Sequence, residues 1–169
     1  MNRALLASAA LLLLLPVAGA MAKSTDRNQA MTIDSGSQSG NMEGNGKTLL
    51  GGGVVVTQGS LEIRSNAAEI HMADGEISRS IFTGKQVKMK QQMDDGSWMD
   101  AQADRVEYDM KSETITFIGN YTVKSDRGSN SGQRMVYNTK SGNMESGGDG
   151  TRVRTVIQPK AAAPAQGKN

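Results

Sequence analysis

Apolar and polar residues alternate one by one through most of the chain, and this period of two constrains the fold more than any other feature. Short segments carry it, such as Leu61 to Ile63, Val106 to Met110 and Ile115 to Phe117. Successive side chains of a strand point to opposite faces, so each segment has one buried face and one face in water. After residue 22, no window of helical length has apolar residues spaced 3.6 apart. The pattern therefore predicts an all-β chain.

Turn-forming residues separate these segments at close intervals. Asp-Gly and Asn-Gly pairs favour the positive φ angles that tight hairpins need. We expect turns at residues 34–37, 44–46, 74–75, 94–96, 126–128 and 141–143. Many short antiparallel strands predict a jelly roll or flattened barrel. A parallel β-solenoid is the alternative, because internal repeats also suit stacked coils.

Parts of the sequence occur twice. The hexapeptide SGNMEG at residues 39–44 returns as SGNMES at residues 141–146. In addition, Gly52 lies 18 residues before Ile70, and Gly119 lies 18 residues before Tyr137. Because the same spacing recurs over that distance, we infer that one strand-and-turn unit is present in two copies. The copies differ where Gly53 in the first corresponds to Asn120 in the second. We read the preceding glycine run, Gly51 to Gly53, as a bulge or bend at a strand start.

The two ends of the chain differ from the middle. Residues 1–22 have the basic start, the apolar run and the small residues of a cleavable signal peptide, with cleavage after Ala20 or Ala22. The apolar run, Ala4 to Leu15, is shorter than the roughly 20 residues of a transmembrane helix, which disfavours a membrane anchor. We expect a short lead at residues 23–28, one β domain at 29–159, a disordered tail at 160–169, and export to the periplasm.

Composition excludes several classes of function. The chain has no cysteine, which removes disulfides, thiolate chemistry and a lipidated N-terminus. Without Arg3, 18 of the 19 basic residues remain against 17 acidic ones, a net charge of +1 with no dense basic block. Nucleic acid is therefore not an expected partner.

Catalytic and metal-binding residues are sparse. His71, the single histidine, is flanked by Ile70 and Met72 on an alternating segment and is expected to face solvent. Asp94, Asp95 and Asp100 are expected in a hairpin loop around Gly96 rather than as a hydrolytic pair. We predict no catalytic residue, no metal site and no cofactor.

Methionine is unusually frequent among the apolar residues. The chain has 11 methionines and six aromatic residues (one Trp, three Tyr and two Phe). Flexible thioether side chains suit an adaptable interior that accepts an acyl chain. Methionine side chains also fill gaps in a core that binds no ligand. Composition alone does not distinguish a ligand-binding interior from such a core. The methionines that supply this apolar set include Met31, Met72, Met89, Met93, Met110, Met135 and Met144.

The chain resembles the LptA family of periplasmic lipopolysaccharide-export bridge proteins, with its OstA-like domain. The matching stretches run from residue 29 to 159 and include GGVVVTQGSLEI from Gly52, ADRVEYDM from Ala103, ITFIGNYTV from Ile115 and TRVRTVIQP from Thr151. The others are AMTIDS from Ala30 and GNMEGNG from Gly40.

The resemblance implies an elongated, twisted antiparallel jelly roll, open at both ends, that holds the acyl chains of lipid A. It implies lipopolysaccharide as the ligand, and as partners the protein itself, an inner-membrane-anchored LptC-like component and the N-terminal domain of an LptD-like outer-membrane translocon. Implied lipid contacts lie at inward positions: Met31, Ile33, Val54, Val56, Ile63, Met89, Val106, Tyr108, Met110, Phe117, Tyr121 and Tyr137.

Open β folds also leave unpaired backbone groups on their first and last strands, which can join protomers end to end. Those edges are expected at Met31, Thr32, Ile33 and Asp34, and at Arg152, Val153, Arg154, Thr155, Val156 and Ile157. Two other classes stay open. A secreted hydrolase would need two carboxylates facing one cavity, and a structural or adhesive module would have a filled core.

Overall fold

The computed structural model describes residues 22–159 and contains ten strands and one short 3-10 helix. The predicted signal peptide, apart from Ala22, and the predicted tail lie outside the described residues. The elements are η1 Ser24–Asn28, β1 Met31–Gly40, β2 Lys47–Gln58, β3 Leu61–Ser65, β4 Ala67–Ala73, β5 Glu76–Gln92, β6 Trp98–Asp109, β7 Thr114–Ser125, β8 Gly128–Asn138, β9 Met144–Ser146 and β10 Arg154–Ile157. Within residues 22–159, no helix is long and apolar enough to cross a membrane.

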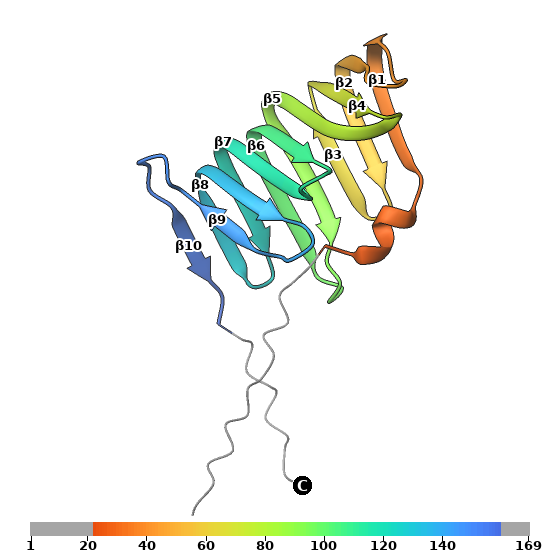
Figure 1. Ribbon diagram of the computed structural model, residues 1–169. Helices are drawn as coiled ribbons and strands as arrows, with labels where there is room; N and C mark the ends of the chain where they lie inside the picture. Colours follow the sequence, from red (N-terminus) through yellow and green to blue (C-terminus); the bar gives the residue numbers. More distant parts are fainter. Residues whose placement is uncertain (1–21, 160–169) are drawn as a thin grey trace, which may run out of the picture.

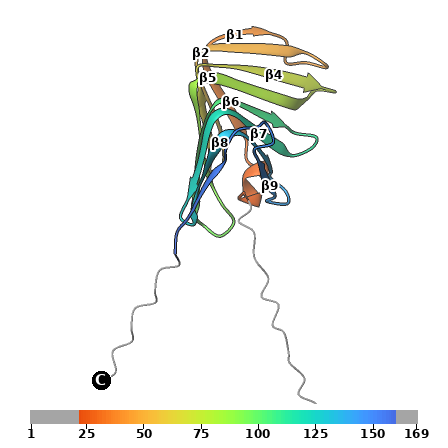
Figure 2. The ribbon, with the colours of Figure 1, turned by 90° about the vertical axis from the view of Figure 1, so that its left-hand side faces the viewer.

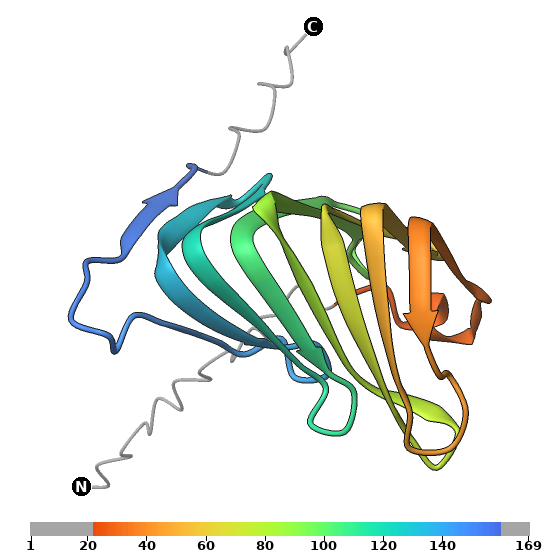
Figure 3. The same ribbon diagram turned by 90° about the horizontal axis from the view of Figure 1, so that it is seen from above.

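All ten strands belong to one antiparallel sheet (Figure 1). The strand order is β1-β2-β3-β5-β6-β7-β8-β10, while β4 pairs with β2 and β5, and β9 pairs with β8. The all-β prediction is confirmed, and the antiparallel pairing excludes the solenoid alternative. β1 and β10 lie at opposite ends of the molecule (Figure 3).

The sheet is bent along a line that crosses its long strands. Figure 2 views the sheet from the side, with two arms meeting at the bend. Register shifts mark the bend in three successive pairings, between Thr83 and Val87 of β5, Gln102 and Arg105 of β6, and Ile118 and Tyr121 of β7. Such bulges insert residues that bend a strand. We call the arm that contains β4 and β9 leaf A, and the arm that contains β3 and β10 leaf B.

The repeated glycine positions lie at this bend. Gly52 and Gly53 of β2 have φ angles of 73° and 86°, and Gly119 and Asn120 of β7 have φ angles of 76° and 46°. A Cβ atom on Gly119 would lie 2.6 Å from Oδ2 of Asp104, so the close approach also requires glycine. The expected equivalence of the two copies is confirmed here. The glycine run lies in the middle of β2, however, not at a strand start.

Three local expectations are wrong. Residues 34–37 form no turn, because the chain continues through a bulge inside β1. The two hexapeptides are not equivalent: residues 39–44 leave β1, whereas residues 141–146 enter β9. Asp100 lies in β6 rather than in the hairpin loop, although Asp94 and Asp95 do lie in it.

The hydrophobic core fills the space between the two leaves. Phe117 of β7 is fully buried, and its cross-strand partners are Val106 of β6 and Met135 of β8, both buried as well. Inward side chains on neighbouring strands therefore form continuous apolar rows, as the alternation predicted. Burying these rows is the main stabilising contribution available to a chain without disulfides.

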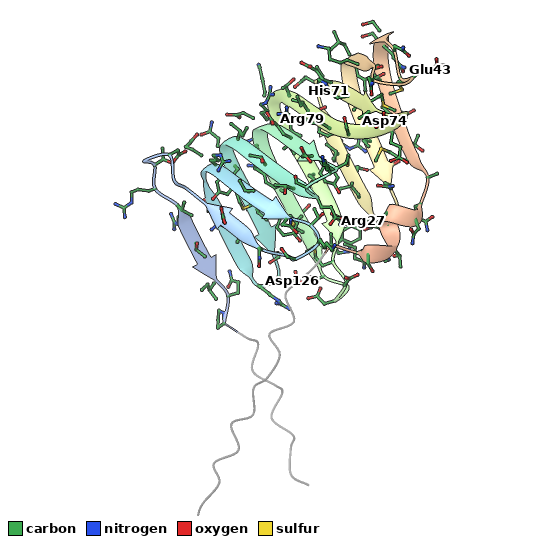
Figure 4. The ribbon with its side chains drawn as sticks, viewed as in Figure 1. Arg27, Glu43, His71, Asp74, Arg79 and Asp126 are labelled. Carbon is green, nitrogen blue, oxygen red and sulfur yellow. The ribbon has the colours of Figure 1, made fainter. Side chains whose placement is uncertain are left out.

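The outer face of leaf A carries ion pairs. Glu107 accepts hydrogen bonds from Arg79 and from Nε of Arg105, the latter at 2.6 Å. Burial alone would raise the pKa of Glu107, but the two guanidinium groups outweigh it and hold the pKa below its usual value. His71 lies opposite Arg79 on the neighbouring strand, as Figure 4 shows, with Nε2 3.5 Å from a carboxylate oxygen of Glu69. His71 thus lies on the outer face, as predicted, but it is only partly exposed and its Nε2 atom is buried there.

Candidate ligand-binding groove

The space between the leaves contains most of the side chains for which lipid contact is predicted. Eight of the twelve are buried in the core: Val54, Val56, Ile63, Met89, Val106, Phe117, Tyr121 and Tyr137. Met31, Ile33 and Tyr108 are partly buried and pack against that core at the β1 end. Met110 lies just after β6, in a turn rather than in the predicted strand, and lines a small cavity of about 10 Å³ with these three residues. These side chains therefore leave little free volume between them at the β1 end.

The interior opens at the other end of the molecule, near β9 and β10. A cavity of about 230 Å³ lies there, and most of its lining is apolar. Its apolar lining residues are Met93, Met99, Val123, Met135, Tyr137 and Met144. We call this cavity the methionine mouth. Met144 of β9 is 49% exposed at its edge, so the mouth meets solvent.

A second apolar depression continues from the methionine mouth along leaf B. It has a volume of about 180 Å³ and is lined by Val123, Met144, Val156 and Ile157, among others. Ile157 of β10 is 81% exposed. Large apolar side chains left in water at a sheet edge usually mark an interaction surface. The apolar surface of the interior therefore extends to the β10 edge.

Of the residues that line the mouth, only Tyr137 was predicted as a lipid contact. Met93, Met135 and Met144 were noted as part of a methionine-rich apolar set, but Met99 and Val123 were not singled out as ligand contacts. Met99 follows Trp98 at the start of β6 and alternates with it. The alternation continues along the strand, and Met99, Ala101 and Ala103 are all buried. This pattern in the sequence could have identified Met99 as an inward-facing residue.

Tyr137 contributes one polar atom to the methionine mouth. Its hydroxyl oxygen is buried near the Ala22 backbone, but no described group meets it with hydrogen-bond geometry. Burial raises the pKa of this hydroxyl, so the group remains a neutral donor at physiological pH. Buried tyrosine hydroxyls normally find a partner.

The N-terminal lead forms a strap across the open side of the bent sheet. Figure 2 shows η1 between the two arms. On leaf B, the Lys23 amide donates to the Gln92 carbonyl at 3.0 Å, and the buried Asp26 carboxylate accepts from the Ser60 hydroxyl. On leaf A, Arg27 pairs with Glu113. The strap was not foreseen, since residues 23–28 carry no alternation or helical period.

Two carboxylates do face one cavity, but not inside the sheet. Glu62 and Asp100 line a depression on the outer face of leaf B, and Lys90 is the cross-strand partner of both. The adjacent Arg64 guanidinium lowers the pKa of Glu62, whereas a general acid needs a raised one. No group of three or more His, Asp or Glu side chains in residues 22–159 could hold a metal ion. Glu62 therefore lacks the raised pKa that a general acid needs.

Comparison with known proteins agrees with this geometry. The family model described as LptA/(LptD N-terminal domain) LPS transport protein matches residues 32–143, from β1 to the turn before β9. The lipopolysaccharide export system protein LptA of Haemophilus influenzae is 32% identical over 160 residues, covering 92% of both chains. LptA of Escherichia coli K12 is 29% identical over 160 residues, covering 88% of this chain and 86% of its own.

A solved structure has the same fold. The crystal structure of LptH, described as the LptA-homologous periplasmic component of the lipopolysaccharide transport device of Pseudomonas aeruginosa, matches with a TM-score of 0.71 at 23% identity. The match covers 80% of this chain and 99% of LptH. The predicted jelly roll is therefore confirmed.

Proposed function

Because the chain belongs to the LptA/LptD N-terminal-domain family of lipopolysaccharide transport proteins, we propose that it binds lipopolysaccharide and shields the lipid A acyl chains as part of a bridge across the periplasm. The single observation that carries this proposal is the apolar interior that opens at the methionine mouth. A structural or adhesive module would have no use for such an opening.

The physical need for such a shield is large. Burying one methylene group is worth about 0.8 kcal/mol, so a chain of roughly a dozen carbons in water costs on the order of 10 kcal/mol. A lipid with several acyl chains cannot cross an aqueous compartment unprotected. Because cargo must also leave, flexible methionine contacts suit transport better than one tight pocket. No chemical step is required of the protein.

The size of the methionine mouth bears on how the ligand is held. Its 230 Å³ lies below the roughly 300 to 1,000 Å³ usual for enclosed small-molecule pockets. Most of the other predicted contacts lie in the core behind the mouth, and the core there is packed. We propose that acyl chains enter by displacing methionine side chains and separating the leaves, and that an adjoining protein completes the mouth.

The photo-labelling pattern along one strand tests the proposed interior site. A photo-reactive side chain is placed in turn at positions 105 to 110. We expect lipopolysaccharide to be labelled from 106, 108 and 110, because Val106 is buried and Tyr108 packs on the core. We expect no labelling from 105, 107 and 109, because Arg105 and Glu107 form ion pairs on the outer face. Uniform labelling, or labelling from odd positions alone, would contradict the proposed interior site.

End-to-end association is the second part of the proposal. The two expected edges both lie in leaf B: residues 31–35 of β1 pair only with β2, and β10 pairs only with β8, among the described strands. A β10 edge could therefore extend the sheet of a second copy at its β1 edge. Arg152 and Val153 precede β10 and are not part of the paired strand. The same two edges are the surfaces we propose for the LptC-like and LptD-like partners.

Removing the β10 edge should prevent this association. A chain that ends at Gly150 should stay monomeric at concentrations where the mature protein forms longer assemblies, as measured by light scattering. A chain that ends at Pro159 retains β10 and serves as the control, and it should assemble like the full mature chain. Equal assembly of the Gly150 and Pro159 truncations would show that β10 is not the joint.

A further inference from the structure

The outer face of leaf B carries a groove of about 400 Å³, larger than the methionine mouth and on the opposite side of the sheet. We call it the outer groove. Its polar lining side chains come from four adjacent strands, β3, β5, β6 and β7: Glu62, Arg64, Lys88, Lys90, Asp100, Gln102, Thr122 and Lys124. Four of these are cations and two are carboxylates.

The lining residues form two cross-strand rows. The row nearer the strand tips runs Glu62, Lys90, Asp100, Lys124, and alternates in charge. The row nearer the bend runs Arg64, Lys88, Gln102, Thr122, and holds two cations followed by two neutral side chains. Arg64 and Lys88 are directly opposite, and like charges in that position destabilise a sheet. The Glu62 carboxylate pairs with Arg64 at 2.6 Å and offsets part of this repulsion, which leaves Lys88 as the unpaired cation that an anion would neutralise.

Most of these cations have no carboxylate partner. Lys88, Lys90 and Lys124 form no ion pair with any residue between 22 and 159, whereas Arg79 and Arg105 on the outer face of leaf A are both paired. The charge of the outer groove is thus available to a ligand. The outer groove spans four neighbouring strands, so it is about 14 Å wide, which is three times the spacing of roughly 4.8 Å between strands.

The outer groove begins next to the methionine mouth. Ser97 and Met99 line the mouth, and Trp98 between them points to the opposite face, where Nζ of Lys90 lies 4.8 Å from its ring centroid. Trp98 is 41% exposed. A molecule that leaves the mouth over the tip of the β5–β6 hairpin would therefore reach the outer groove directly.

We propose that the outer groove binds the phosphorylated saccharide of the same glycolipid whose acyl chains occupy the interior, an inference that rests on the proposed function. Lysine and arginine donors form charge-assisted hydrogen bonds to phosphate oxygens. Gln102 and Thr122 can donate to and accept from sugar hydroxyls, and the carboxylates of Glu62 and Asp100 accept from them. One ligand would then bind both sides of leaf B.

A phosphorylated sugar fits the outer groove better than an anionic membrane does. The groove is concave, so the headgroups of a flat bilayer would not reach its floor. Glu62 and Asp100 would also repel a continuous anionic surface, whereas a saccharide can place its hydroxyls beside them and its phosphates beside Lys88 and Lys124.

A binding titration tests the inference. The probe is the phosphorylated oligosaccharide that remains after alkaline removal of the ester- and amide-linked acyl chains from lipopolysaccharide, and its binding is followed by NMR on the mature protein. The test variant carries Lys88→Gln and Lys124→Gln. The control carries Lys85→Gln and Arg134→Gln, which remove the same charge from exposed residues outside both grooves, and neither residue forms an ion pair with any residue of the described chain.

We expect the test variant to bind the oligosaccharide at least about tenfold more weakly, because each charge-assisted hydrogen bond contributes more than a neutral one. The control should match the wild-type protein. Oligosaccharide treated with phosphatase should bind as weakly as the test variant does, and equimolar inorganic phosphate should not displace the intact probe.

Three outcomes would overturn the inference: no binding of the phosphorylated probe, equal losses in both variants, or stronger lysine-dependent binding to anionic phospholipid vesicles. Photo-labelling from position 108 by intact lipopolysaccharide is measured in parallel. Interior labelling without oligosaccharide binding would reject the outer groove alone. Oligosaccharide binding without interior labelling would reject the proposed function and leave the outer groove as a saccharide site.

Discussion

Shortening Phe117 to alanine is expected to lower the free energy of unfolding by about 3 to 5 kcal/mol. The side chain is fully buried between Val106 and Met135 on the neighbouring strands, so its removal leaves a cavity between the two leaves. Since domains of this size are stable by only about 5 to 15 kcal/mol, the loss would be a large fraction of the total. Urea unfolding at fixed protein concentration measures it.

Thr116→Ala provides the control for this change. Thr116 directly precedes Phe117 on β7, and its partners Glu107 and Val136 lie on the outer face with it. Its truncation should change the free energy of unfolding by less than about 1 kcal/mol. Similar losses for the two variants would mean that the space between the leaves is not the main core.

Replacing Met144 with aspartate is expected to weaken lipopolysaccharide binding at least about tenfold while leaving the fold intact. Met144 is half exposed at the edge of the mouth, so the folded protein can hydrate the new carboxylate. A bound acyl chain would take that water away, and burying an ionised group without a partner is strongly unfavourable. Fluorescent lipopolysaccharide measures the affinity, and thermal unfolding checks the fold.

Asn143→Asp is the matched control for Met144→Asp. It adds the same charge one residue earlier, on an exposed side chain that makes no side-chain hydrogen bond to the rest of the described protein. It should bind lipopolysaccharide like the wild-type protein. If both variants lose affinity equally, the effect is long-range charge repulsion, and the methionine mouth is not a contact site.

The fold was predictable because strand alternation is a local signal. Five of the six expected turns lie between strands, and the inward positions expected on β2, β3, β6 and β7 are buried or pack on the core. The failure at residues 34–37 has a physical reason. Asp, Ser and Gly favour turns, but the same residues are used in the β1 bulge where the sheet bends.

The bulges also explain why part of the groove was missed. On β6 the inward residues are Met99, Ala101 and Ala103 before the register shift, but Val106 and Tyr108 after it. The shift moves the buried face from odd to even positions. A prediction that assumes strict alternation along the whole of β6 therefore identifies the buried residues of only one half of the strand.

Other features depend on contacts between residues far apart in the sequence. Arg27 of the strap donates to the hydroxyl of Thr139 at 2.9 Å, across 112 residues of sequence. The methionine mouth likewise combines β6, β7, β8 and β9 with the loop after β5. The spacing of apolar residues within one segment does not indicate which distant segments contact each other. Both features could therefore be identified only from the structure.

Isolation of the protein from Gram-negative cell envelopes, without detergent, tests the central claim most directly. Mass spectrometry of the purified protein identifies the lipids that accompany it. Our account predicts that lipopolysaccharide with its acyl chains co-purifies with the wild-type protein and with Asn143→Asp, and is largely lost from Met144→Asp. Protein that carries no glycolipid, or equal amounts on all three proteins, would contradict it.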